Sequence, residues 1–143
     1  MPANTVPIYS KTPDVSTNNG TGTGDPITAA AADYTGISAN YVLEHTAGAN
    51  GSYIRKLRFK ALGTNVAAVA RIFLNNGATA ATATNNVFYG EVSLPATTAS
   101  TTSGTADIDY PMEIALPATW RIYVGLGAAV AAGWDCVAVA GQY

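Results

Sequence analysis

Charged side chains are scarce in this sequence. They make up 11% of its 143 residues, against about 25% in ordinary soluble domains. The net charge is −2, so no overall positive field attracts nucleic acid, and we expect no nucleic-acid partner. A weakly charged exterior has two explanations: a compact monomer with a neutral surface, or a surface that other subunits cover. We favour the second, because part of the chain is apolar on both faces of a strand.

Residues that act as metal ligands, bases or nucleophiles are also few. Cys136 is the single cysteine and His45 the single histidine, which excludes an internal disulfide and leaves too few ligands for a zinc site. Cys136 stands among valines and alanines, as a small buried hydrophobic residue does. Glu44 and His45 face opposite ways in a regular strand, so we expect His45 to be structural or exposed rather than a catalytic base. We therefore expect neither an enzyme nor a cofactor.

Long apolar runs are missing as well, although 48% of the residues are hydrophobic. No run approaches the roughly 20 residues of a bilayer-spanning helix. The N-terminus has no basic start followed by an apolar segment, so we expect no signal peptide, no membrane partner and synthesis in a cytoplasm. No GxxxxGK[ST] motif is present, and the glycines at 22 and 24 follow no predicted strand, so a nucleotide-binding loop is not indicated.

The most informative stretch is residues 52–77, SYIRKLRFKALGTNVAAVARIFLNNG, which predicts two strands closed by a turn at Asn75-Asn76-Gly77. Side chains alternate between the two faces of a strand. One face of the first strand therefore holds Arg55, Leu57, Phe59 and Ala61, and the opposite face holds Ile54, Lys56, Arg58 and Lys60. One face of the second strand holds Val66, Ala68, Ala70, Ile72 and Leu74, and its opposite face holds Ala67, Val69, Arg71 and Phe73. A strand apolar on both faces is covered on both faces. We therefore expect Val69 and Phe73 to need cover beyond one sheet-to-sheet core.

Lys56, Arg58 and Lys60 form a basic stripe on one face of the first of these strands. One interpretation is a solvated outer face or an edge protected by charge against aggregation. The other is a surface that steers the protein toward an acidic partner. Both interpretations remain open at the level of the sequence.

Residues 1–24 differ in composition from the remaining domain, residues 25–143. Three prolines interrupt them, and residues 16–24 (STNNGTGTG) have the composition of a flexible linker. Val6, Ile8 and Tyr9 are the substantial apolar residues of this segment. We interpret it as an extended N-terminal arm that could lie on a neighbouring subunit through these three residues; the alternative is a frayed terminus.

The remaining pattern is that of an all-β protein. Residues 41–46, 86–94, 107–116, 120–126 and 134–140 predict further strands, whereas residues 25–40 fit a strand or a short helical turn. Phe88, Val92 and Leu94 share one predicted face, with a bulge expected at Gly90. Pro111 points outward from the strand at 107–116, which indicates an edge position. We predict an antiparallel β-sandwich, jelly-roll-like, with the extended N-terminal arm.

Two further groups of residues have side chains of the kind that bind ligands. Asp107 and Asp109 share a predicted strand face and could bind calcium or serve a glycosidase, but a solvated, charged edge fits the pattern better. Trp120 and Trp134 could stack on sugar rings, but both have the parity of core residues. We therefore predict no metal site and no catalytic pair.

Several short stretches resemble a group of small virion proteins of tailed bacteriophages. The matching stretches are Ser52-Tyr53-Ile54-Arg55-Lys56-Leu57, Gly63-Thr64-Asn65, Ala70-Arg71-Ile72-Phe73-Leu74-Asn75-Asn76-Gly77, Glu91-Val92-Ser93-Leu94-Pro95, Leu116-Pro117, Gly133-Trp134 and Gly141-Gln142-Tyr143. The resemblance covers roughly residues 20–143, and its motifs are turn and core patterns rather than functional signatures. It implies a β-sandwich structural protein of the virion.

From this resemblance we expect a capsid decoration, or cement, protein on the phage head that binds and stabilises the shell of major capsid protein. A homotrimer made in the host cytoplasm is the expected form. Val6, Ile8 and Tyr9 are the candidate docking residues, with Lys56, Arg58 and Lys60 steering toward an acidic capsid surface. The alternative is a tail or fibre module that binds a receptor carbohydrate.

Overall fold

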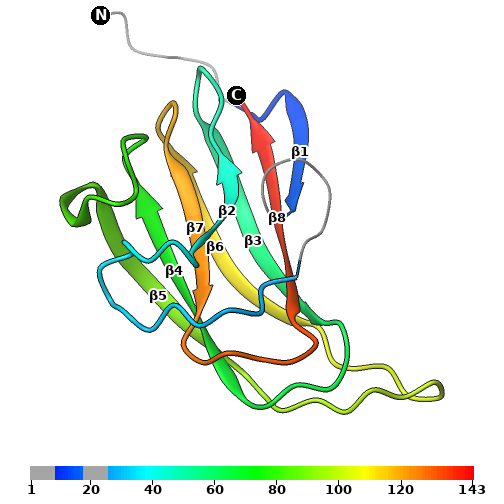
Figure 1. Ribbon diagram of the computed structural model, residues 1–143. Coiled ribbons are helices and arrows are strands. Elements are labelled where there is room, and N and C mark those ends of the chain that lie inside the picture. The colour runs from blue at the N-terminus through cyan, green and yellow to red at the C-terminus, as the bar shows by residue number, and fades with distance from the viewer. Residues whose placement is uncertain (1–8, 18–25) are drawn as a thin grey trace, which may run out of the picture.

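The computed structural model describes residues 9–17 and 26–143. It is a sandwich of two antiparallel four-stranded sheets (Figure 1). The strands are β1 Thr12–Thr17, β2 Val42–Thr46, β3 Ser52–Ala61, β4 Ala68–Asn75, β5 Asn86–Leu94, β6 Ile108–Leu116, β7 Arg121–Leu126 and β8 Trp134–Gln142, with a 3-10 turn at Ala83–Asn85 before β5. The predicted all-β, antiparallel sandwich is confirmed, whereas its jelly-roll character stays a prediction.

The strand orders are β1-β8-β3-β6 in one sheet, here sheet A, and β2-β7-β4-β5 in the other, sheet B. Strand β6 is therefore an edge strand, as the outward proline predicted. Pro111 is exposed in it, and Met112 and Leu116 of the opposite parity are buried. A proline is tolerated there because no further strand needs its missing backbone N–H.

The hydrophobic core lies between the inner faces of the two sheets. Leu57 and Phe59 of β3, Ile72 of β4, Ile122 of β7 and Trp134 of β8 are all fully buried in it. Each such side chain stabilises the fold by about 1.5–3 kcal/mol relative to an exposed position. Full burial of Trp134 confirms its predicted core position. Because alternate side chains of each strand are fixed in this core, the side chains between them are held on the outer faces of the two sheets.

Cys136 and Trp120 both lie at the core. Cys136 is 1% exposed, which confirms a small buried hydrophobic residue. Trp120 is half-buried and packs against the same core. Trp134 is fully buried and Trp120 half-buried, so the sugar-stacking alternative has no support from Trp134 and little from Trp120.

A β-bulge in β3 overturns part of the predicted parity. Ile54 pairs with Ala140 and Lys56 with Val139, so Arg55 has no partner of its own on β8. The extra residue shifts the alternation by one. Ile54 is therefore fully buried and Arg55 exposed, the reverse of the prediction for both residues.

A second bulge lies in β5. Ile72 pairs with Gly90 and Phe73 with Phe88, which leaves Tyr89 as the extra residue. A bulge was predicted at the neighbouring Gly90, but its consequence was not. Phe88 is turned to the outer face of sheet B, where it contacts Phe73, instead of sharing the inner face with Val92 and Leu94.

The outer face of sheet B is covered in part by the chain itself. Figure 1 shows the segment before β2, in blue to cyan, crossing β7, β4 and β5. This segment forms neither the strand nor the helical turn that the sequence predicted. Two isolated β-bridges, Ile27 to Trp134 and Ala30 to Leu126, attach its first residues to the sandwich. Phe73 is 1% exposed beneath it and packs against Ala31 and Tyr41 of this segment. Phe73 therefore has the cover beyond the sheet-to-sheet core that the sequence predicted, but the chain itself supplies this cover, so the inference of another subunit is wrong for Phe73; Val69 stays half-buried.

Strand β1 lies within the segment predicted as an arm. It pairs antiparallel with β8 from Thr12–Gln142 to Thr17–Val137 and forms one edge of sheet A. Val6 and Ile8, two of the three predicted docking residues, lie outside the described residues. Tyr9 precedes β1 and is 75% exposed.

Candidate functional site

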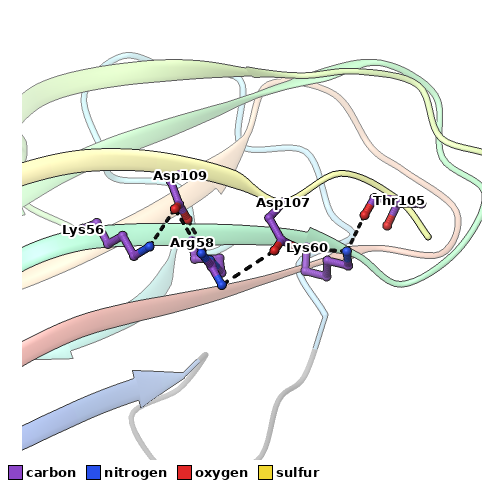
Figure 2. A network of polar contacts seen from close by, with 6 residues as sticks. All are labelled: Lys56, Arg58, Lys60, Thr105, Asp107 and Asp109. Carbon is purple, nitrogen blue, oxygen red and sulfur yellow. Dashed lines mark hydrogen bonds and ion pairs between the residues drawn. The ribbon is translucent and has the colours of Figure 1, made fainter.

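The outer faces of the two sheets differ in chemistry, and each holds a candidate surface. On sheet A, Lys56, Arg58 and Lys60 of β3 lie opposite Asp107 and Asp109 at the start of β6 (Figure 2). We call these five residues the charged face. The predicted basic stripe is thus present, since all three cations share one surface, but it does not stand alone.

Asp109 is the centre of the charged face. Its carboxylate accepts hydrogen bonds from Lys56 Nζ at 2.6 Å and from Arg58 Nε and Nη2 at 2.8 and 3.1 Å. Lys60 Nζ lies 2.9 Å from Asp107 Oδ1 and also donates to the carbonyl of Thr105. Three cations facing two carboxylates leave a local charge of +1, so little free positive potential remains for steering a partner.

The pairing also sets the protonation of the two carboxyl groups. Hydrogen bonds from Arg58 and then Lys56 hold the pKa of Asp109 well below its usual value, and the bond from Lys60 lowers the pKa of Asp107. Both groups therefore stay ionised, and their partners stay bound, at neutral pH. These pairs are solvent-exposed, so salt screens them and they contribute little to stability. Their position at β6 fits the protected-edge interpretation.

The outer face of sheet B is aromatic. Its members, here the aromatic face, are Tyr34, Tyr41, Phe73, Phe88 and Tyr123. The ring centroids of Tyr41 and Phe73 are 4.9 Å apart, and those of Phe73 and Phe88, and of Phe88 and Tyr34, are each 5.3 Å apart. Tilted and edge-to-face contacts of this kind are favourable beyond the area they bury.

The aromatic face has an anchored base and an open rim. Tyr41 and Phe73 are 7% and 1% exposed, whereas Tyr34 and Phe88 are 56% and 39% exposed. Gly36, in the left-handed region at φ +73°, sits so close to the Phe73 ring that a Cβ would lie 2.8 Å from it. The two exposed rings are therefore held on a packed support rather than on a free loop.

Arg71 of β4 ties the covering segment to sheet B. Its Nη1 donates to the Ala31 carbonyl at 3.2 Å and its Nη2 to the Tyr34 hydroxyl at 3.1 Å, while its Cζ lies 4.1 Å from the centroid of the Tyr34 ring. Arg71 Nε is buried without a hydrogen bond, 3.8 Å from Glu91 Oε2. The guanidinium thus orients Tyr34 by both hydrogen bonding and cation–π contact.

A shallow hollow of about 340 Å³ adjoins Arg71. It is lined by Ala67, Ala68, Val69, Arg71, Gly127 and Ala128. The small residues leave room beside the guanidinium, and a Cβ at Gly127 would lie 3.3 Å from Arg71 Nη2. The half-buried Val69, which the sequence predicted to need cover, lines this hollow.

His45 belongs to a buried polar chain, not to a surface site. Its Nε2 lies 2.8 Å from Ser52 Oγ, and its Nδ1 lies 3.0 Å from Ser16 Oγ and 3.7 Å from Asp14 Oδ2. The Ser16 hydroxyl donates to Asp14 Oδ1 at 2.9 Å, so Nδ1 donates to Ser16 and Ser52 donates to Nε2. His45 and Ser52 are both fully buried, whereas Asp14 and Ser16 are half-buried. The chain has the residue types of a nucleophilic triad, but its histidine and Ser52 are closed to solvent.

The predicted opposition of Glu44 and His45 is wrong. Strand β2 has a bulge between Leu43 and His45, and both Glu44 and His45 are fully buried. Burial raises the pKa of Glu44 well above its usual value and lowers that of His45. Burial also raises the pKa of the Cys136 thiol, which keeps it protonated.

The other candidates from the sequence are separated or otherwise engaged. Tyr9 lines a hollow of about 400 Å³ with Ser10, Tyr53 and Tyr143, which shares no residue with the charged face or the aromatic face. Asp107 and Asp109 are paired with cations, and in residues 9–17 and 26–143 no three His, Cys, Asp or Glu side chains form a metal-binding group. Within the same residues, none of the helical structure has the length and apolar character needed to span a bilayer.

Sequence reasoning missed the aromatic face as a surface. The one sign of this surface in the sequence was that Arg71 and Phe73 fall on the same face of β4 by alternation. Comparison with protein-family models, with curated proteins and with solved structures gave no match. The resemblance to phage virion proteins therefore stays a prediction.

Proposed function

We propose that this chain is a structural protein of a phage virion: a capsid decoration protein that binds the major capsid protein as a homotrimer and stabilises the head. Three findings support the proposal: the sequence resemblance, the β-sandwich fold that it implied, and an exposed aromatic surface suited to protein contact. The proposed docking surface is the aromatic face together with the hollow beside Arg71.

The observation that carries the proposal is the pair of exposed rings, Tyr34 and Phe88, on a buried aromatic support. Tyrosine, phenylalanine and arginine are enriched at the centres of protein interfaces, because they bury large areas at little cost in side-chain entropy. Arg71 and Phe73 hold both rings in place before docking. Little ordering entropy is then lost when a partner covers them.

The charged face is a weaker docking candidate. Its cations already have carboxylate partners, so binding an acidic surface there would exchange one set of ion pairs for another. In our proposal Lys56, Arg58 and Lys60 contribute at most a salt-dependent increase in the association rate. Weak contacts per copy suffice on a shell, since a multimer that engages several sites at once gains avidity.

The test is occupancy on particles of the phage that encodes the chain. The double variant Tyr34→Ser/Phe88→Ser removes both exposed rings, and we expect it to fold and to lose most of its occupancy in co-sedimentation with heads. Leu62→Ser is the matched control, because Leu62 is 49% exposed outside the aromatic face. Full occupancy of the double variant, or an equal loss in the control, would contradict the proposal.

The predicted arm needs a separate variant. Val6→Ser/Ile8→Ser/Tyr9→Ser leaves β1 intact and removes the three apolar side chains proposed to dock. Reduced occupancy with a normal unfolding midpoint would support the arm as a second contact. Unchanged occupancy would remove it from the proposal.

One observation favours a second candidate, a carbohydrate-binding module on a tail or fibre. Tyr34 and Phe88 are exposed, and the carboxylate of Glu91 lies near Arg71 beside them, which is an aromatic–carboxylate group of the kind sugar sites use. Against it, the two rings stand at 80° to each other and offer no flat platform for consecutive sugar rings. Binding on a glycan array that Tyr34→Ser abolishes, without sedimentation with heads, would favour this candidate.

A further inference from the structure

Strand β1 is attached to the sandwich without apolar anchoring. The two buried hydrophobic clusters of the described residues contain no residue of β1. Val15, its one large apolar side chain, is 65% exposed. The core is therefore complete without this strand, and removing it uncovers little hydrophobic area.

Polar contacts hold β1 instead. On its inward side, Ser16 bonds His45 Nδ1, and Asp14 accepts a hydrogen bond from the Gln142 side chain. The backbone of Lys11, just before β1, donates to the Gln142 carbonyl at 2.7 Å. Hydrogen bonds of this kind form equally well within a chain and between two identical chains.

The other half of the attachment is the edge of β8. Six residues of β8, from Val137 to Gln142, pair in register with β1. Without β1, the same residues would present an unpaired row of backbone donors and acceptors, which is a template for an incoming strand. The strand that fits it best in length, register and polar side chains is β1 itself.

We propose that β1 is an exchangeable strand: the edge of β8 and the His45 side chain of one copy bind β1 of a second copy in the same register. The site takes an extended segment of the sequence Thr12–Thr17, with Ser16 contacting His45 and Asp14 contacting Gln142. Because the exchanged contacts are the intramolecular ones, exchange joins copies without any new interface chemistry. The proposal concerns contacts between copies and does not depend on what the aromatic face binds.

Chain length permits the exchange. Residues 18–25 separate β1 from the segment that begins the core, and a fully extended chain of that length spans about 30 Å. A neighbour within this reach can receive the strand, and crowding on an ordered surface raises its effective concentration.

The experiment uses full-length single-cysteine additions at a pair of facing positions. Val15 and Val139 are register partners across β1 and β8, and the native Cys136 is buried and protonated. Val15→Cys and Val139→Cys chains are mixed in denaturant, refolded together and oxidised, so that slow undocking cannot hide an exchange. The double variant Val15→Cys/Val139→Cys, oxidised at low concentration, establishes that the pair can form a disulfide.

We expect a dimer linked between positions 15 and 139, identified by peptide mass mapping, whose yield rises with protein concentration. The control mixes Val139→Cys with Ala99→Cys, which lies in an exposed loop, and we expect no linked dimer from it. If the double variant forms its disulfide but the mixture yields no 15–139 dimer above the control, β1 does not exchange and the proposal is wrong.

Discussion

The charged face of sheet A and the aromatic face of sheet B are built from the same kind of scaffold in opposite ways. The first draws its five side chains from β3, from the neighbouring β6 and from Asp107 just before β6, and pairs every cation with a carboxylate. The second draws its rings from the segment before β2 and from three strands of sheet B. One surface is satisfied within the chain, whereas the other leaves two large rings exposed.

The difference separates a surface that protects from a surface that binds. Charges at the β6 edge resist pairing with foreign strands and remain hydrated. Exposed rings on a rigid support gain free energy when another apolar surface covers them. The few charged residues of the sequence are therefore distributed unevenly over the surface. Five of the sixteen Lys, Arg, Asp and Glu residues lie on the charged face.

Phe73→Ala is the change with the largest expected effect. Phe73 is 1% exposed and supports both Tyr41 and Phe88, so the variant leaves a cavity under the covering segment. We expect a loss of about 3 kcal/mol in the free energy of unfolding, measured with urea. A loss below about 1 kcal/mol would mean that the aromatic face has no packed base.

Tyr41→Phe has a smaller expected effect and a distinct pH dependence. It removes hydrogen bonds to the carbonyls of Asp33 at 2.5 Å and Ala31 at 3.2 Å, at a cost of about 1 kcal/mol at neutral pH. Burial raises the pKa of Tyr41 to about 12 from 10.0, so above pH 10 the unfolded chain loses a proton that the folded chain keeps. Wild-type stability should fall between pH 10 and 12, and the fall should be smaller in Tyr41→Phe.

Urea unfolding of both proteins at pH 8 and pH 11 measures this difference. Tyr53 and Tyr110 also have raised pKa values, but they are present in both proteins and cancel in the comparison. Parallel pH profiles would show that the Tyr41 phenol ionises freely and is not sealed beneath the covering segment.

Asp109→Asn has the smallest expected effect, although it removes the centre of the charged face. The stabilisation from this carboxylate is present above pH 3.8 and is lost as pH falls through its lowered pKa. We expect a slight loss of stability at pH 7 in low salt, which disappears in concentrated sodium chloride because exposed pairs are screened. A large loss that resists salt would show that the charged face carries a structural role as well.

The charged face shows how far the sequence alone can lead. Regular alternation in β6 predicted the outward side of Asp109 and the edge position of Pro111, and both are confirmed. The stripe of Lys56, Arg58 and Lys60 was predicted in the same way. Period-two parity is a local property, so it holds along any stretch that no bulge interrupts, such as β3 from Lys56 onward, beyond its bulge at Arg55.

The aromatic face could not be predicted because it depends on two non-local events. The bulge at Tyr89 turns Phe88 outward; Gly90 signalled a bulge nearby, but not which residue would be the extra one or which side chains would change face. The cover over Phe73 comes from a segment with neither helical nor strand periodicity. Strand β1 escaped notice for a related reason: Thr12–Thr17 contains one large apolar residue, and its pairing with β8 is made by backbone.

Footprinting of the protein docked on phage heads tests the central claim most directly. Hydroxyl-radical oxidation reports on Tyr34 and Phe88, and amine labelling reports on Lys56 and Lys60 in the same sample. We predict strong protection of the two rings upon docking, with unchanged labelling of the lysines. Protection of the lysines with the rings still open to oxidation would contradict the account and assign docking to sheet A.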